Sequence, residues 1–346
     1  MTPIRPEDLL PRPAQPVYGK EAIKLIEGKT VLVTGAGGSI GSEIVRQCVR
    51  LNAARIIKID ADESALFRLS LDLFGHALFL EEDDVCLADV TNRSEMSRII
   101  NKTQPDIVFH AAAKKHLPLV QSYPKMASDV NVFGTESVMA ACVENNVAQV
   151  VNVSTDKAAD PTSVLGWTKR LAEFISAEQS TPTTRIASVR FGNVLGSNGS
   201  LLPSILHQLE HGKVLSLTHP EATRYFMTIP EAAGLVIEAA CLNTGGDVFV
   251  LDMGEPVKVR DLMIKISRLS GYGDPEFTIT GLRPGEKLHE VLFSDAHEVR
   301  MRTEHPRIFT TQVASSIDID RKLCELSTLL RENADAADLR ETLALY

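Results

Sequence analysis

The chain has 346 residues, which is too long for one small domain and suits one large domain with an added lobe; 44% of the residues are hydrophobic and 23% charged, as is ordinary for a globular protein. Its net charge of -9, with basic residues scattered along the chain, argues against a nucleic-acid-binding surface. No apolar run reaches the roughly 18 residues of a membrane span, and the five cysteines form no CxxC pair, so we expect a soluble, cytoplasmic protein without a metal site or a membrane span.

Residues 1–28 begin with closely spaced prolines and continue with a short amphipathic pattern from Glu21 to Ile26. We expect this N-terminal arm to pack on the domain that follows or on a neighbouring subunit. The sequence leaves both possibilities open.

A buried strand is predicted at residues 29–34, and a glycine-rich segment follows it and opens a helical pattern. This segment contains Gly35, Gly38, Ser39, Ile40 and Gly41. Glycines at such a turn let the backbone approach a pyrophosphate, and the N-terminus of the helix attracts that anion. The pattern predicts a dinucleotide site.

The next predicted strand, residues 55–59, ends at Asp60. A carboxylate at this position can accept hydrogen bonds from both hydroxyls of the adenosine ribose, and it would repel a 2′-phosphate. It therefore favours NAD over NADP, although Arg68 is near enough to leave NADP open.

A third strand is expected at residues 78–80 or 85–87, before Asp89 and Val90, and a fourth at residues 106–110. Asp89 is positioned to reach an adenine amino group, to cap the next helix, or to do both. The fourth strand leads into Ala111 and Ala112, whose small side chains let a cofactor lie against the backbone.

Basic residues follow these alanines: Lys114, Lys115 and His116. At the carboxyl edge of a sheet they are placed to bind a phosphate or a sugar, although a purely structural role is an equal alternative. Asn131 lies in a helical pattern, and a buried asparagine there would need hydrogen-bond partners near the active site.

The strongest chemical signal follows a fifth strand at residues 150–153. It consists of Ser154, Thr155, Asp156 and Lys157, with Lys169 in the next helical pattern. An open parallel sheet carries its chemistry just outside the carboxyl ends of its strands, and these groups suit acid–base catalysis. The alternation of strands and helices over residues 29–157 predicts an α/β fold with a doubly wound parallel sheet.

A sixth strand, residues 186–191, precedes Asn193, and beyond residue 198 the regular alternation ends. Arg224 and a Pro/Gly turn with Arg283, Glu286 and Lys287 are candidates to clamp a diphosphate, with surface salt bridges as the alternative. We expect a Rossmann domain at 29–197, a substrate-binding lobe at 198–310 with some segments returning to the first domain, and C-terminal helices at 311–346.

Several ordered motifs together resemble the extended short-chain dehydrogenase/reductase superfamily, and within it the polysaccharide-biosynthesis branch of UDP-N-acetylglucosamine 4,6-dehydratases. The resemblance spans roughly residues 17–310. It rests on residues 34–41, 111–116, 154–158, 166–173, 190–194, 224–228 and 282–287. Large members of the branch carry an N-terminal membrane region, and this chain resembles their catalytic part alone, as in the short soluble members.

The resemblance implies a tightly bound NAD that takes a hydride from sugar C4 and returns it to C6 after water is eliminated across C5 and C6. It implies that Asp156 protonates the departing C6 hydroxyl and that Lys157 removes the C5 proton. Lys169 would hold the nicotinamide ribose, and Ser154 or Thr155 would hydrogen-bond the C4 oxygen. For its role, Lys157 would need a pKa pulled toward neutrality by partial burial and by Lys169 or the cofactor.

Leu165 departs from the superfamily, which usually has a tyrosine there that takes the C4 hydroxyl proton. Large dehydratases of this branch resemble the chain in having an apolar residue at this position. Lys157, Lys169 or a water chain would then remove the C4 proton, unless the step is lost. Trp167 replaces the usual alanine and either narrows the sugar pocket or fills the packing.

A UDP-sugar 4,6-dehydratase acting on UDP-N-acetylglucosamine is therefore the function that we expect, in a homo-oligomer by resemblance. The alternatives are an epimerase or a 5,6-dehydratase that uses the same 4-keto intermediate, and a non-catalytic cofactor-binding protein. The Asp156–Lys157 pair argues against plain C4 epimerisation, which needs no base at C5.

Overall fold

The computed structural model describes residues 4–12, 18–76, 84–294, 296–312, 318–332, 338–339 and 342. The predicted strand at 78–80 lies outside these ranges, whereas the alternative at 85–87 is formed. Of the C-terminal segment predicted to be helical, residues Ile319–Arg331 form a helix, whereas residues 311–312 belong to a strand instead. Residues 313–317, 333–337, 340–341 and 343–346 lie outside the described ranges.

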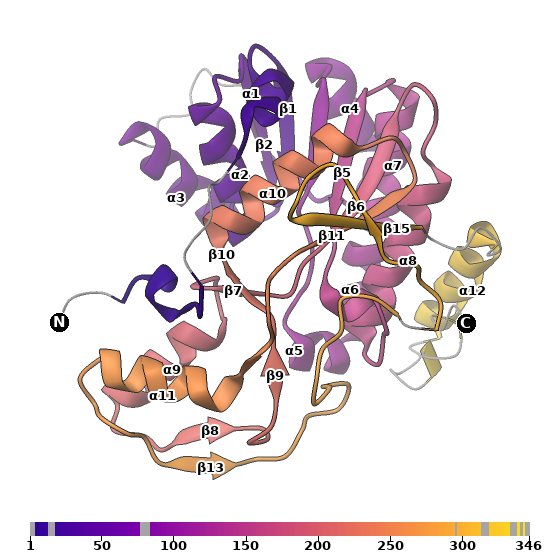
Figure 1. Ribbon diagram of the computed structural model, residues 1–346. Helices are drawn as coiled ribbons and strands as arrows, with labels where there is room; N and C mark the ends of the chain where they lie inside the picture. Colours follow the sequence, from indigo (N-terminus) through magenta and orange to yellow (C-terminus); the bar gives the residue numbers. More distant parts are fainter. Residues whose placement is uncertain are drawn as a thin grey trace.

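Nine strands within the described ranges form one sheet in the order β14-β15-β11-β6-β5-β4-β1-β2-β3 (Figure 1). Its parallel part contains β1 (Thr30–Thr34), β2 (Arg55–Asp60), β3 (Val85–Leu87), β4 (Ile107–His110), β5 (Gln149–Val153), β6 (Arg185–Arg190) and β11 (Asp247–Leu251). At one edge, β15 (Ile308–Gln312) and β14 (Met301–Arg302) are added antiparallel. The predicted doubly wound parallel sheet is confirmed.

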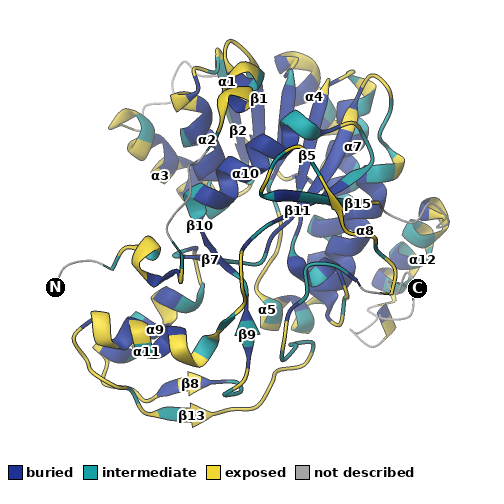
Figure 2. Cartoon of the chain, viewed as in Figure 1, coloured by how far each residue is buried: buried dark blue, intermediate teal, exposed yellow. Residues whose placement is uncertain are grey.

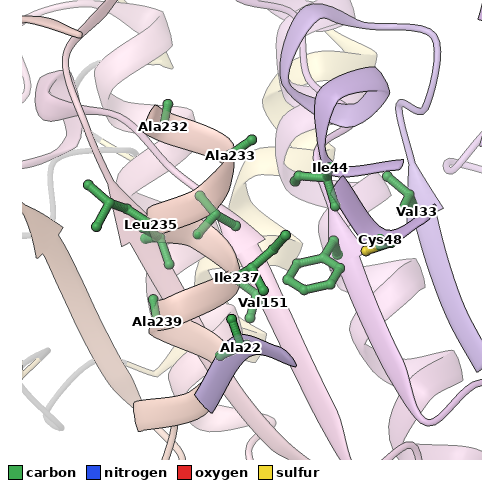
Figure 3. Close-up of a cluster of buried hydrophobic side chains, with 14 of the residues drawn as sticks. Ala22, Val33, Ile44, Cys48, Val151, Ala232, Ala233, Leu235, Ile237 and Ala239 are labelled. Atoms are coloured by element: carbon green, nitrogen blue, oxygen red, sulfur yellow. The ribbon is translucent and has the colours of Figure 1, made fainter. Parts of the chain in front are cut away.

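Helices cover both faces of the sheet. One face carries α1 (Lys20–Ile26), α2 (Ser39–Arg50), α3 (Glu63–Phe74) and α10 (Ile229–Leu242). Figure 3 shows how side chains of α2 and α10 meet over the sheet, with Ile44 and Cys48 facing Ile237. The other face carries α4 (Arg93–Thr103), α7 (Gly134–Glu144) and α8 (Val164–Glu178).

Shorter elements extend this second face. The helices α5 (Leu117–Ser122) and α6 (Pro124–Ser128) pack on α8, and the side chains of α12 (Ile319–Arg331) join the same apolar cluster. None of the helices in the described ranges is long and apolar enough to cross a membrane.

A smaller lobe lies below the sheet in Figure 1. It contains α9 (Leu201–Glu210) and α11 (Val259–Leu269) with the strand pairs β8 (Leu215–Leu217) and β13 (Phe277–Ile279), and β9 (Thr223–Arg224) and β12 (Val257–Lys258). A third pair, β7 (Asn193–Leu195) and β10 (Phe226–Thr228), joins the lobe to the sheet domain. Figure 2 shows the buried inner and exposed outer sides of α9 and α11.

Residues 4–12 of the N-terminal arm pack on this lobe, whereas α1, which belongs to the same arm, packs on the sheet domain. Residues Pro6–Leu9 form a short 3₁₀ helix, η1, and Leu9 and Leu10 are buried in the core of the lobe beside Ile205 and Met263. Of the two expectations for the arm, packing on its own chain therefore holds for residues 4–12.

Four fully buried charged side chains join the sheet domain to the segment that follows the lobe. Arg190, at the end of β6, donates to Glu173 of α8 at 2.7 Å and to Glu298 at 2.7 and 2.8 Å. Arg170 of α8 contacts the same two carboxylates. Two positive and two negative groups thus balance each other in the protein interior, where an unpaired charge would be costly.

His110, the last residue of β4, is a fully buried neutral group. Its Nδ1 lies 2.7 Å from the hydroxyl of Thr34 and its Nε2 lies 3.1 Å from that of Thr135. Burial, together with the positive charge of Lys169, lowers the pKa of His110 from 6.5 to about 3. The folded protein therefore resists protonation at a site that the unfolded chain protonates readily.

We expect the His110→Gln variant to lose part of the acid sensitivity of folding. Below about pH 6.5 the unfolded chain binds a proton here that the folded chain refuses, so the free energy of unfolding falls as the pH falls, by up to about 1.4 kcal/mol per pH unit. Urea unfolding between about pH 6.5 and pH 5 measures this slope. The exposed His211→Gln variant is the control and should keep the wild-type slope. If His110→Gln has a slope as steep as the wild type, His110 is not the group that makes folding sensitive to acid.

Candidate active site

A cavity of about 1000 Å³ runs along the carboxyl ends of the strands and continues toward the lobe. All of the predicted cofactor residues line it: Gly35, Gly38, Ser39, Ile40, Gly41, Asp60, Asp89, Val90, Ala111, Ala112 and Lys169. So do the predicted substrate residues Lys115, His116, Asn193, Arg224, Arg283 and Glu286, and the catalytic candidates Ser154, Thr155 and Lys157. Asp156, which is fully buried, does not line the cavity, and neither do Lys287 of the expected clamp and Asn131.

The glycine-rich segment between β1 and α2 lies so close to other backbone that side chains would collide with it at two positions. Gly35 has a φ of +65°, and a Cβ there would lie 2.6 Å from the backbone nitrogen of Ala112. A Cβ at Gly41 would collide with the carbonyl of Gly35. No side chain of the described residues caps the N-terminus of α2, and free amides at a helix N-terminus are groups that can bind an anion.

Asp60 is held in place at the end of β2. Its Oδ2 accepts a hydrogen bond from the backbone of Gly37 at 2.9 Å, and its Oδ1 accepts one from the backbone of Asp62 at 3.0 Å. The carboxylate is thereby fixed against the glycine-rich turn. A carboxylate fixed in this way differs from a freely solvated turn residue, and it could accept hydrogen bonds from the ribose of a dinucleotide.

The residues after β3 differ in one respect from the expectation. The N-cap of α4 is Asn92, whose side chain accepts from the backbone of Glu95, and not Asp89. Asp89 instead accepts hydrogen bonds from the backbone and hydroxyl of Thr91, both at 2.9 Å. Asp89 thus forms a turn three residues before the N-cap Asn92, because its short side chain accepts a hydrogen bond from the backbone amide of Thr91, two residues later.

Asn131 connects three parts of the site. It lies in a single π-helical turn, η2 (Asp129–Phe133), and is fully buried. Its amide side chain accepts from the backbone of Lys114 at 2.8 Å, donates back to that residue at 3.0 Å, and donates to Thr168 on α8 at 3.2 Å. Asn131 therefore fixes the loop after β4 relative to α8.

Lys157 and Asp156 form an ion pair in η3 (Asp156–Ala158), directly after β5. Lys157 Nζ donates to Asp156 Oδ1 at 2.8 Å, and the Thr155 hydroxyl donates to the same oxygen at 2.9 Å. Glu290, which was not among the predicted site residues, also lies near the amine, with its Oε1 3.7 Å from Lys157 Nζ. Apart from its position four residues after Glu286, no sequence signal marks Glu290.

The expected lowering of the Lys157 pKa is wrong for this arrangement. Burial opposes the positive charge of Lys157, but the Asp156 and Glu290 carboxylates outweigh it and raise the pKa above the usual lysine value. Lys169 behaves in the opposite way, because burial lowers its pKa to about 8. Its Nζ is buried and has no hydrogen-bond partner within the described residues, and the residue lines the cavity.

Leu165 lies at the cavity one helical turn before Lys169 and is almost fully buried. Trp167 faces away from the cavity into the apolar cluster with α12, and its Nε1 donates to Pro161 at 3.0 Å. Of the two interpretations of Trp167, packing is confirmed. Ser154 donates its hydroxyl to Glu173 at 2.6 Å and so links the site to the buried charges.

Two of the residues expected to bind a diphosphate, Arg224 and Lys287, form hydrogen bonds and ion pairs with other residues of the protein. Arg224 donates to Glu286 at 2.9 Å and to the carbonyl oxygens of Thr223 and Leu288. Lys287 pairs with Asp160 at 3.3 Å. The salt bridges weighed as an alternative therefore exist, and Arg283, at the cavity, remains the candidate for phosphate binding.

A connection across the cavity mouth was not expected from the sequence. The backbone of Asn198 donates to the Ser39 hydroxyl at 3.0 Å, and Lys115 Nζ donates to Ser197 at 3.4 Å. Gly199, with a φ of +67°, packs against the ring of His116. This segment after β7 joins the glycine-rich turn to the basic residues that follow β4.

Residues 31–313 match the family described as "Polysaccharide biosynthesis protein". The capsular polysaccharide biosynthesis protein CapD of Staphylococcus aureus is 42% identical over 319 residues, which are 90% of this chain and 52% of the relative. A UDP-glucose 4-epimerase of Rickettsia prowazekii is 32% identical over 274 residues, 77% of this chain and 78% of the relative. The chain spans about half the length of CapD and of the similar EpsC of Bacillus subtilis.

Solved structures share the fold. DesIV of Streptomyces venezuelae, a dTDP-glucose 4,6-dehydratase with NAD bound, superposes with a TM-score of 0.70 at 20% identity, over 88% of this chain and 97% of DesIV. At that identity the likeness concerns the fold alone. The family match and the fold agree, and the chain belongs to the polysaccharide biosynthesis protein family, within the extended short-chain dehydrogenases/reductases.

Proposed function

We propose that the chain is an NAD-dependent UDP-sugar 4,6-dehydratase and that UDP-N-acetylglucosamine is its substrate. The observation that carries the proposal is the Lys157 amine, held by Asp156 at the same cavity as the glycine-rich turn, Asp60 and Lys169. A C4 epimerase leaves the C5–H bond intact and therefore needs no base beside C5. A 4,6-dehydratase needs one, because the C5 proton must leave with the C6 hydroxyl.

The cavity residues fit NAD. The glycine turn at Gly35 and Gly41 would hold the pyrophosphate, and Asp60 would hold the ribose of the adenosine half. The buried amine of Lys169, which has no partner within the described residues, would hold the ribose of the nicotinamide half. When bound, NAD would take up a hydride at C4 and deliver it at C6. Lys157 then removes the C5 proton, which the 4-keto group makes acidic.

The substrate side of the cavity suits a nucleotide sugar. Arg283 supplies a guanidinium for the diphosphate, and Lys115 and His116 supply further donors near the sugar. The Rickettsia relative acts on UDP-glucose by its name, and DesIV on dTDP-glucose, so nucleotide sugars are the shared substrate class. Assembly of the chain into a homo-oligomer stays a prediction.

Incubation with UDP-N-acetylglucosamine and NAD, followed by mass spectrometry, tests the function. We expect a product lighter by one water, and in heavy water one deuterium at C5. A 4-epimerase, the second candidate because of the Rickettsia relative, changes neither the mass nor C5. Absence of turnover of any UDP-hexose by the NAD-loaded protein would contradict both.

We expect the Asp60→Ala variant to bind NAD about 10-fold to 100-fold more weakly, because a charged acceptor contributes about 1.5–3 kcal/mol to a hydrogen bond. The same change removes the repulsion of a 2′-phosphate, so affinity for NADP should change less or rise. Calorimetric titration with both dinucleotides measures the ratio, with Asp72→Ala on the exposed side of α3 as the control. An unchanged ratio would place the ribose elsewhere.

A further inference from the structure

The hydroxyl of Thr155 joins the cavity to a carboxylate that the cavity itself does not reach. Thr155 lines the cavity, whereas Asp156 is completely buried and does not line it. The Thr155 hydroxyl donates to Asp156 Oδ1 at 2.9 Å, and its oxygen accepts from the backbone of Lys157 at 3.5 Å. Because its one proton is committed to Asp156, Thr155 can only accept a hydrogen bond from a group in the cavity.

Ser154, the other hydroxyl at this edge of the sheet, is committed to a different carboxylate. It donates to Glu173 Oε1 at 2.6 Å. The oxygens of Glu173 also accept from Arg190 at 2.7 Å and from Arg170 at 3.2 Å. Hydrogen bonds from two guanidinium groups favour the charged form of a carboxylate, so Glu173 is a poor acceptor for a proton from the cavity.

Asp156 is bound less completely than Glu173. Its Oδ1 accepts from Thr155 and from Lys157, but its Oδ2 is buried and has no hydrogen-bond partner within the described residues. A buried charged oxygen without a partner is costly, and a proton on the carboxyl group lowers that cost because it removes the charge. Of the two carboxylates that these hydroxyls reach, Asp156 is therefore the one suited to take up a proton.

We propose that Thr155 relays the proton of the C4 hydroxyl to Asp156 while C4 is oxidised. The inference rests on the proposed dehydratase function. It gives a path to the proton that a tyrosine takes in most of the superfamily and that Leu165 cannot take. Before the reaction, the C4 hydroxyl donates to Thr155 and Thr155 donates to Asp156, so the path is a continuous chain of hydrogen bonds.

Bonds and protons balance in this step. C4 loses its hydride to the oxidant of the proposed function, NAD. The C4 O–H bond breaks and its proton goes to the Thr155 oxygen, while the proton of Thr155 goes to Asp156 Oδ1. A C4–O double bond forms, and Asp156 becomes a carboxylic acid. Thr155 then donates to the new keto oxygen, so the hydrogen bond reverses its direction as the acceptor forms.

The proton on Asp156 prepares the two later proton transfers. The departing C6 hydroxyl consumes one proton, in agreement with the donor role that the family resemblance implies for Asp156. Burial opposes the charge of Lys157, and the carboxylates of Asp156 and Glu290 outweigh burial and raise its pKa. Once Asp156 is neutral, that pKa falls. Lys157 then releases a proton to water more readily, becomes the base for C5, and recovers a proton at the end of the cycle.

An analogue of UDP-N-acetylglucosamine with hydrogen in place of the C6 hydroxyl isolates the oxidation. It has no leaving group, so its reaction stops at the 4-keto stage and is followed by the absorbance of reduced nicotinamide. We expect Thr155→Val and Asp156→Asn each to slow this oxidation by about 10²-fold to 10⁴-fold, the usual range for a positioned proton transfer. If Asp156 acts only at C6, or if Lys169 takes the C4 proton, Asp156→Asn oxidises the analogue at the wild-type rate, and the relay is overturned.

Two further variants separate a relay from a structural role. Thr155→Ser keeps the hydroxyl and should oxidise the analogue within about 10-fold of the wild-type rate. The two residues of a relay act as one unit, so Thr155→Val combined with Asp156→Asn should be no slower than the slower single variant. Additive losses would contradict the relay. Thr183→Val, at an exposed threonine that does not line the cavity, is the matched control.

Binding gives a readout that does not depend on turnover. An analogue with fluorine in place of the C4 hydroxyl cannot donate a hydrogen bond to Thr155. In calorimetric titrations with NADH present, which cannot oxidise C4, we expect it to bind about 3-fold to 10-fold more weakly than UDP-N-acetylglucosamine. Thr155→Val should bring the two affinities to within about 2-fold of each other. Equal affinities in the wild type would show that the C4 hydroxyl does not donate to Thr155, and the relay would lose its first link.

The wild type keeps the two levels of inference apart. If the wild type neither oxidises the analogue nor releases water from any UDP-hexose, the dehydratase proposal fails, and the relay fails with it. If the wild type does both and Thr155→Val keeps the wild-type rates, only the relay is overturned.

Discussion

Replacing Lys157 with methionine is expected to lower water elimination by about 10³-fold or more and to remove deuterium exchange at C5, because no other amine lies beside Asp156 and Glu290 within the described residues. Methionine keeps an unbranched side chain that is only one heavy atom shorter than that of lysine. The loss therefore reports the missing amine and not an empty space. Mass spectrometry of the product and of the recovered substrate in heavy water measures both effects.

Lys157→Arg sharpens this test. The guanidinium keeps the charge between Asp156 and Glu290 but cannot release its proton in a protein, so we expect the same loss with the fold intact. Lys258→Met, at an exposed lysine that pairs with Glu221, is the control. C5 exchange that persists in both Lys157 variants would exclude this lysine as the base.

Replacing Arg190 with methionine is expected to cost about 3–5 kcal/mol of the free energy of unfolding. The guanidinium is fully buried and bonds Glu173 and Glu298, so its removal leaves two carboxylates beside the single cation of Arg170. Urea unfolding measures the loss, and an effect below about 1 kcal/mol would show that water reaches these groups.

A second substitution tests whether the cost comes from charge. In Arg190→Met combined with Glu298→Gln, Arg170 and Glu173 are left as one positive and one negative group. We expect the double variant to be more stable than Arg190→Met alone, because the buried charges cancel again. A strictly additive loss would instead assign the effect to packing.

The sheet and the cofactor side of the cavity could be predicted from local patterns. Several parallel strands are short, mostly apolar runs that lead into a candidate site residue, such as Gly35 after β1 or Asp60 at the end of β2. The parallel arrangement then brings these ends together without any knowledge of side-chain contacts. For this reason all of the predicted cofactor residues line one cavity.

The substrate side could not be predicted equally well, because it depends on contacts between distant segments. Glu290 and Arg224 are 66 positions apart. Neither the burial of Glu290 nor its distance to Lys157 follows from the residues next to it in the sequence. The expected direction of the Lys157 pKa was wrong for the same reason. Partial burial was anticipated, but the second carboxylate beside the amine was not.

The path of the chain through the buried charges has a consequence for biosynthesis. Arg170, Glu173 and Arg190 leave the ribosome well before Glu298, which lies beyond the whole lobe. Until Glu298 arrives, the interior of the nascent sheet domain carries one uncompensated positive charge. We therefore expect the sheet domain to complete its native packing only near the end of translation, and chains that are interrupted before residue 298 to depend on chaperones.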